Sequence, residues 1–147
     1  MLLNIAVAGL LMLATTAIHA GGMAVALHLT RERVGRLRTR LRQLHFYWIA
    51  AVVLLMFVVS LLEVSLWAVM YVWLDAIEHF ERALYFSTVT FTTLGYGDIV
   101  LDPRWQLLAA FEAANGIIMF GWTTAIVVAV VQRVYFGDRK GSGGVEA

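Results

Sequence analysis

The chain has 147 residues, of which 61% are apolar and 14% are charged, and its formal net charge is +1. An ordinary soluble domain is about half apolar and about a quarter charged, so this composition indicates lipid as the solvent, and the small net charge gives no indication of a nucleic-acid partner. The sequence contains no cysteine, and none of its 4 histidines has the spacing of a known metal-ligand motif, which excludes disulfides and thiolate chemistry and leaves an enzyme, a catalytic metal and a cofactor without support.

The first predicted element is a transmembrane helix over residues 1–30. Residues 2–29 contain no Asp, Glu, Lys or Arg, and a membrane-crossing helix takes about 20 apolar residues. A cleaved signal peptide is the less favoured alternative, because the extreme N-terminus has no basic residue and the apolar run is too long. His19 and His28 are isolated on this span, and we expect both to be structural.

Residues 31–45 form a basic connector, with 6 arginines from Arg31 to Arg42. Positively charged residues stay on the cytoplasmic side of a membrane, and further basic residues follow the third span. The protein is therefore expected in the cell membrane, with its N-terminus outside and its C-terminus in the cytoplasm. Apolar residues recur in the connector at three- and four-residue steps, which favours a helix on the inner membrane surface with its arginines toward anionic lipid. A solvated loop is the alternative.

The rest of the chain divides into a second module over residues 46–136 and a short, polar, glycine-rich tail over 137–147, which we expect to be disordered and cytoplasmic. Two further predicted spans, 46–74 and 105–136, frame the module. Between them, residues 80–91 (FERALYFSTVTF) are mostly apolar but, at 12 residues, too short to cross the bilayer. They predict a re-entrant half-helix. The expected fold class is thus an all-α membrane protein of three transmembrane helices, a half-helix and a filter loop.

The loop TTLGYGD, which follows the half-helix, has the composition of a selectivity filter. Irregular backbone at membrane depth is tolerated only where it is buried in protein or lines a water-filled path. A potassium ion that leaves water needs oxygens in place of its hydration shell, and rings of backbone carbonyls from four such loops supply them. Gly95 and Gly97 permit the positive φ that this backbone needs, and Thr93 can add a hydroxyl oxygen. We expect Leu94 and Tyr96 to point away from the axis and to pack.

Residues 46–136 resemble the pore module of potassium channels, in particular the small bacterial kind with two transmembrane helices. The segment ALYFSTVTFTTLGYGD, residues 83–98, resembles that family's half-helix and filter, and NGIIMFGWTTA, residues 115–125, is similar to its pore-lining helix. The resemblance implies a homotetramer, since each subunit supplies one strand of the filter, and K⁺ as the permeant ion. The K⁺ ligands that it implies are Thr93, Leu94, Gly95, Tyr96 and Gly97.

Some positions of the family pattern differ here, and others identify further residues. Leu94 stands where the family usually has valine or isoleucine, and Val89 stands where some members have a glutamate behind the filter. Tyr85 occupies the position of an aromatic residue that often forms a hydrogen bond with the last residue of the filter. The resemblance therefore implies a bond between Tyr85 and Asp98.

Two glycines of the third span are the candidate gating hinge. Gly116 matches the family's hinge glycine, and Gly121 belongs to a phenylalanine–glycine pair that recurs in the family. Small residues also permit close packing of helices in a membrane. For Gly121, packing alone is the alternative.

Glu63 and Glu112 lie inside the second and third spans, where a carboxyl group is energetically costly and usually has a function. We expect them to support the filter from behind, with bonds to the half-helix backbone or to Thr88, Thr90 and Asn115. A structural hydrogen bond between helices is the alternative.

The sequence therefore predicts a potassium-selective channel that conducts K⁺ passively and catalyses no reaction. One alternative is a weakly selective cation channel, although such relatives usually change the tyrosine or the second glycine of the filter. A second is a pore-like subunit of a potassium uptake transporter, which usually has four degenerate loops in one long chain. A third is a non-conducting regulatory or assembly subunit. The first span lies outside the resemblance, so its role is open.

Overall fold

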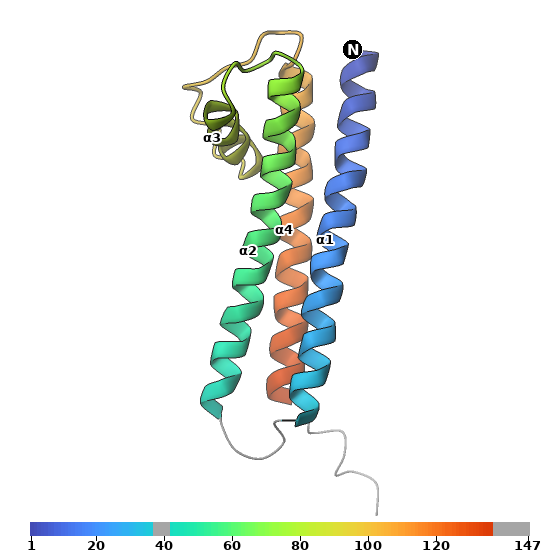
Figure 1. Cartoon of the computed structure of the whole chain (residues 1–147), viewed down its shortest axis with the longest axis vertical. Helices are drawn as coiled ribbons and strands as arrows, with labels where there is room; N and C mark the ends of the chain where they lie inside the picture. The colour runs from blue at the N-terminus through green and yellow to red at the C-terminus, as the bar shows by residue number, and fades with distance from the viewer. Residues whose placement is uncertain (37–41, 137–147) are drawn as a thin grey trace, which may run out of the picture.

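The computed structural model describes residues 1–36 and 42–136, which form four helices without any strand. The helices are α1 (Leu2–Arg36), α2 (Arg42–Trp73), α3 (Phe80–Phe91) and α4 (Gln106–Phe136). Figure 1 shows α1, α2 and α4 side by side as a bundle, with the short α3 beside α2 near the end that holds the N-terminus. The predicted all-α fold class, with a half-helix between the second and third long helices, is confirmed.

Three of these helices are long and apolar enough to cross a membrane. The candidate spans are Leu2–Glu32, Phe46–Trp73 and Gln106–Tyr135. They agree with the predicted spans to within a few residues, because long runs without charge dominate the hydropathy of this sequence. Pro103, the one proline of the chain, lies in the loop before α4, where its missing N–H costs no helical hydrogen bond.

The basic connector differs from its predicted boundaries. Helix α1 continues without interruption to Arg36, and α2 already begins at Arg42, since arginine and leucine are good helix formers and no proline interrupts this segment. The described residues of the predicted helix over 31–45 therefore belong to the ends of α1 and α2 and do not form a helix of their own. Residues 37–41 lie outside the described residues. The same holds for residues 137–147, for which the sequence predicts a disordered tail. The contact of the connector with anionic lipid stays a prediction.

The side chains buried in the bundle form one large apolar cluster and two smaller ones. The large cluster lies toward the end that includes α3 and combines residues of all four helices, among them the fully buried Trp67 and Phe91. The smaller clusters follow toward the other end and consist of Met56, Val59 and Ile126, then Ala26, Val52 and Val130. Large apolar side chains such as Leu54 and Phe57 are exposed, which fits a surface in contact with lipid.

Helix α1 packs against α2 and α4, and α3 packs against the same two helices. In the view of Figure 1, α1 and α3 lie on opposite sides of the α2–α4 pair. The approach of α1 to α2 is close at Gly22, where an added Cβ would collide with the side chain of Val59. Because lipid is as apolar as leucine, helices in a membrane associate through such close packing and through polar contacts.

Candidate ion-conducting loop and its polar supports

The loop TTLGYGD begins where α3 ends, and hydrogen bonds to the last turn of α3 fix its start. The backbone N–H of Thr93 donates to the carbonyl of Thr90 at 2.9 Å, and that of Leu94 donates to the carbonyl of Val89 at 3.0 Å. The first peptide groups of the loop are thereby held at the C-terminal end of a helix. The partial negative charge of a helix C-terminus favours a cation at this place.

The backbone of the loop alternates between two conformations. Positive φ occurs at Thr93 (62°), Gly95 (55°) and Gly97 (77°), and not at Leu94 or Tyr96 between them. Glycine adopts positive φ at little steric cost, whereas a β-branched residue rarely does. When left-handed and right-handed conformations alternate, successive peptide groups can face the same side of the chain, which is the arrangement that a column of carbonyl oxygens requires.

Two side chains of the loop are exposed in the single chain. Leu94 is 57% exposed and Tyr96 is 67% exposed. The sequence predicts that both pack behind the carbonyls, and a single chain offers them no such surroundings. Their packing is therefore a prediction about an assembly of chains.

The predicted hydrogen bond between the half-helix and the end of the loop is present. The phenol of Tyr85 on α3 donates to Oδ2 of Asp98 at 2.7 Å. The acceptance of this bond by Asp98 raises the pKa of Tyr85 above its ordinary value, because loss of the phenol proton would remove the bond. The bond thus attaches the last residue of the loop to the middle of α3.

Glu112 joins three helices behind the half-helix. Its Oε2 accepts a 2.6 Å hydrogen bond from the phenol of Tyr71 on α2, and its Oε1 bonds to the hydroxyl of Ser87 on α3. The Ser87 hydroxyl also lies 2.9 Å from the carbonyl oxygen of Val64. Glu112, Tyr71 and Ser87 are all fully buried. A buried carboxyl group needs such partners, and these tie α3 to both long helices of the pore module.

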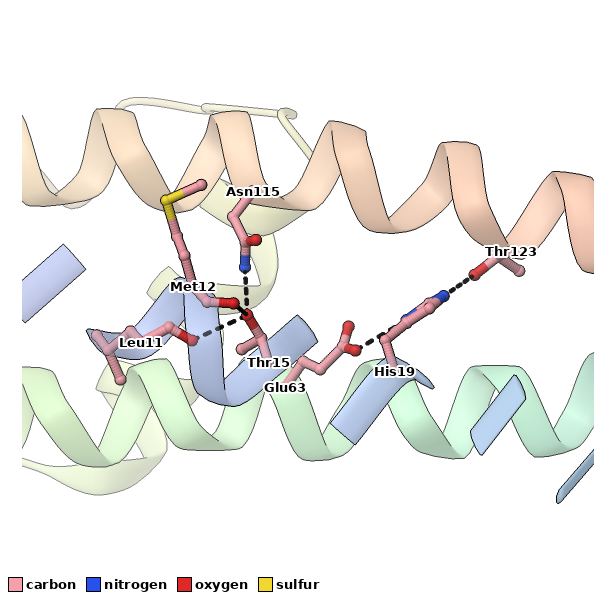
Figure 2. A network of polar contacts seen from close by, with 7 residues as sticks. All are labelled: Leu11, Met12, Thr15, His19, Glu63, Asn115 and Thr123. Carbon is pink, nitrogen blue, oxygen red and sulfur yellow. Dashed lines mark hydrogen bonds and ion pairs between the residues drawn. The ribbon is translucent and has the colours of Figure 1, made fainter. Parts of the chain in front are cut away.

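Glu63 forms its hydrogen bond with α1 and not, as predicted, with the half-helix. Its Oε1 lies 2.8 Å from Nδ1 of His19, and both side chains are completely buried. The other ring nitrogen of His19, Nε2, lies 3.4 Å from the hydroxyl of Thr123 on α4. Figure 2 shows the imidazole between these two partners. His19 is therefore not isolated, as the sequence suggested, but placed where α1, α2 and α4 meet.

The partners predicted for the two glutamates form other bonds. Nδ2 of Asn115 donates to the hydroxyl of Thr15 on α1 at 2.9 Å, which Figure 2 also shows, and the hydroxyl of Thr88 donates to the carbonyl of Leu84 at 2.7 Å. Sequence reasoning missed Thr15 and His19 as polar contacts of the pore module. Their spacing of four residues on an uncharged helix was the available signal, since it places both on one face.

The two candidate hinge glycines have different surroundings. A Cβ added at Gly116 would collide with the carbonyl oxygen of Phe91, at the end of α3. A Cβ added at Gly121 would meet no atom within 4 Å. Gly116 therefore permits close contact between α4 and the half-helix, and its role as a hinge stays a prediction, as does that of Gly121.

Comparison with known proteins identifies the module that contains this loop. The family model described as "Ion channel" matches residues 44–133, which include nearly all of α2, the whole of α3 and the loop, and most of α4. Searches among curated proteins and among solved structures give no match. The described residues, 1–36 and 42–136, contain no cluster of three or more His, Cys, Asp or Glu side chains that could hold a metal ion.

Proposed function

The chain belongs to the two-transmembrane pore-module family of ion channels, and from this premise we propose that it is a potassium-selective channel that conducts K⁺ passively as a homotetramer. The family model covers residues 44–133. Neither the ion selectivity nor the number of subunits follows from membership of the family alone. Both parts of the proposal are supported by the loop TTLGYGD.

The observation that favours K⁺ is the alternation of positive φ at Thr93, Gly95 and Gly97 directly after a half-helix. In filters of this composition, backbone carbonyls replace the hydration shell of K⁺. The proposed ligands are the carbonyl oxygens of Thr93, Leu94, Gly95, Tyr96 and Gly97, with the Thr93 hydroxyl at the inner end. Tyr85 and Asp98 would hold the loop, and Glu112 would hold the half-helix through Ser87.

The proposed tetramer explains the exposed side chains of the loop. One chain supplies one strand, and a closed ring of carbonyls needs four. In that ring, Leu94 and Tyr96 would pack against neighbouring subunits and be removed from solvent. Closed symmetry is also the usual arrangement of homo-oligomers.

The orientation that we propose places the loop and the N-terminus outside and the C-terminus in the cytoplasm. It rests on the arginines from Arg31 to Arg42 and on Arg133 at the end of α4, because basic residues stay inside. The acidic residues around the loop then face outward, where they attract cations. Anionic lipid on the inner surface is the proposed partner of the connector.

A potassium flux assay on purified protein in liposomes tests this function. We expect K⁺ flux from the full-length chain and none from Gly95→Ala, because alanine at a φ of +55° is strained by roughly 1–2 kcal/mol and would turn the neighbouring carbonyls. Flux of Na⁺ equal to that of K⁺ would favour the weakly selective channel. Absence of flux from correctly assembled protein would favour the non-conducting subunit.

A further inference from the structure

Helix α1 lies outside residues 44–133, which the family model matches, and yet its buried polar side chains face the pore module. Thr15 and His19 are completely buried and bond to Asn115 of α4 and Glu63 of α2. Polar side chains inside a membrane almost always face the interior of a bundle and pair with one another. These two residues therefore define the face through which α1 docks on the pore module.

The imidazole of His19 connects α2 with α4. Its geometry fits the tautomer in which Nδ1–H donates to Glu63 at 2.8 Å and Nε2 accepts from the hydroxyl of Thr123 at 3.4 Å, since a neutral imidazole has one donor and one acceptor nitrogen. The first bond has ordinary length, and the second is at the long limit of hydrogen bonding. The imidazole is thus attached to α2 more firmly than to α4. We name this connection the Glu63–His19–Thr123 bridge.

The two halves of α4 are held in different ways. In the half near α3, Glu112 bonds to Tyr71 and Ser87, and Gly116 lies against the end of α3. Beyond Gly121, the contacts of Ile126 and Val130 with α1 and α2 are apolar. The long bond of Thr123 to His19 adds a directional contact in this half. Displacement of the second half therefore disturbs weaker interactions than displacement of the first.

We infer that α1 is a restraining helix, which holds the part of α4 beyond Gly121 against α2 through the Glu63–His19–Thr123 bridge and thereby favours the non-conducting position of α4. The inference rests on the proposed function and on the resemblance of residues 115–125 of α4 to a pore-lining helix, and it adds a regulatory element from outside the matched module. When the second half of α4 moves outward, the bond between Thr123 and His19 breaks first and the bond between His19 and Glu63 remains. The channel opens on this separation and closes when the bond forms again.

Substitution of Thr123 tests the bridge with little change in shape. Thr123→Val removes the hydroxyl and should raise the ratio of open to closed time about threefold for each subunit, the factor that corresponds to an average hydrogen bond between membrane helices. Thr123→Ser keeps the hydroxyl and should behave as the unaltered protein does. Thr124→Val is the matched control, because the Thr124 hydroxyl donates to the carbonyl of Phe120 within α4.

The measurement is single-channel recording of the full-length protein in planar bilayers, with the reversal potential in mixed Na⁺ and K⁺ as a second readout. The inference expects a raised open probability for Thr123→Val with unaltered selectivity, and a lowered open probability would overturn it. If the unaltered protein conducts K⁺ and Thr123→Val has the same open probability as Thr124→Val, the inference is overturned while the proposed function stands. If the unaltered protein carries no potassium current, the proposed function is overturned and the inference with it.

Crosslinking supplies a second measurement, which the absence of native cysteine makes specific. Ala26, Val52 and Val130 share one buried cluster of α1, α2 and α4. Oxidation of Ala26→Cys/Val130→Cys should abolish the potassium current of the crosslinked channels, and reduction should restore it. Loss of free thiols measures how much of the protein is crosslinked. In the control Ala26→Cys/Val52→Cys, oxidation should leave the current unchanged. Unchanged current after oxidation of the first pair would overturn the inference.

Discussion

Tyr71 and Glu112 meet in a 2.6 Å hydrogen bond at the junction of α2, α3 and α4, with both side chains completely buried. Glu112 also bonds to Ser87, so one carboxyl group joins the half-helix to the two long helices of the pore module. The loop TTLGYGD follows directly from this half-helix. The position of the loop therefore depends on contacts that lie several residues away from it.

Removal of the Tyr71 hydroxyl tests this dependence. Tyr71→Phe leaves a buried carboxyl oxygen without its donor, which costs about 1–3 kcal/mol, and should lower the midpoint of thermal unfolding in detergent. Tyr47→Phe is the control, because Tyr47 lies on the same helix and is 68% exposed. Equal midpoints for the two variants would show that the bond to Glu112 contributes nothing to stability.

The bond between Tyr85 and Asp98 predicts an effect on selectivity. Tyr85→Phe should lower the permeability ratio of K⁺ to Na⁺ several-fold, because the end of the loop loses its attachment to α3. Asp98→Asn, which keeps an acceptor oxygen, should have a smaller effect. Reversal potentials in mixed salt measure both, and an unchanged ratio in Tyr85→Phe would contradict the role given to this bond.

The same bond predicts the dependence on pH. Acceptance by Asp98 raises the pKa of Tyr85 in the folded protein. The contribution of the bond to stability is therefore complete below the ordinary tyrosine pKa of about 10 and is lost as the pH rises through the raised folded-state value. Thermal unfolding at increasing alkaline pH should show this loss, and the loss should be absent in Tyr85→Phe.

The two glycines of α4 should respond differently to alanine. Gly116→Ala would force the helix away from the carbonyl of Phe91 and should reduce the yield of assembled protein in size-exclusion chromatography. Gly121→Ala has space for its Cβ within the chain and gains about 1 kcal/mol of helix propensity, so it should assemble. Normal assembly of Gly116→Ala would contradict the close contact with α3.

The buried pair of His19 and Glu63 should tolerate the loss of both polar groups better than the loss of one. His19→Leu leaves the Glu63 carboxyl buried without its partner and should destabilise the fold by about 3 kcal/mol. The double variant His19→Leu/Glu63→Leu removes both polar groups and should recover most of this loss. His28→Leu is the control, because the His28 side chain is exposed and its Nε2 lies 3.4 Å from Oε1 of Glu32, which is also exposed. Thermal midpoints measure all of these variants, and a double variant no more stable than His19→Leu would disprove the coupling.

The spans, the half-helix and the loop could be predicted because they depend on local properties of the chain. Long uncharged runs identify the spans, and the 12 residues of α3 are too few to cross a bilayer. Gly95 and Gly97 indicate positive φ at their own positions, and the structure adds the same conformation at Thr93. The resemblance of residues 83–98 to potassium channel sequences also identified Tyr85 as the partner of Asp98.

The partners of Glu63 and Glu112 could not be predicted in the same way. Counting residues from the end of a helix gives the depth of a side chain in the membrane, but not the direction in which it points relative to neighbouring helices. For Glu63, the partner lies on α1, which has no counterpart in the family pattern. Glu63 consequently meets His19 rather than the half-helix, and Glu112 meets Ser87 and Tyr71. The extension of α1 to Arg36 was missed because the arginines suggested a separate element.

The reversal potential of reconstituted protein, recorded with a K⁺-rich solution on one side of the bilayer and a Na⁺-rich solution of equal total cation concentration that contains some K⁺ on the other, tests the proposed selectivity most directly. The proposed column of carbonyl oxygens from residues 93–97 predicts a potential close to the potassium equilibrium potential, which shifts with the potassium gradient. It predicts that Gly95→Ala abolishes the current. A reversal potential near zero, with Na⁺ carrying as much current as K⁺, would contradict the account.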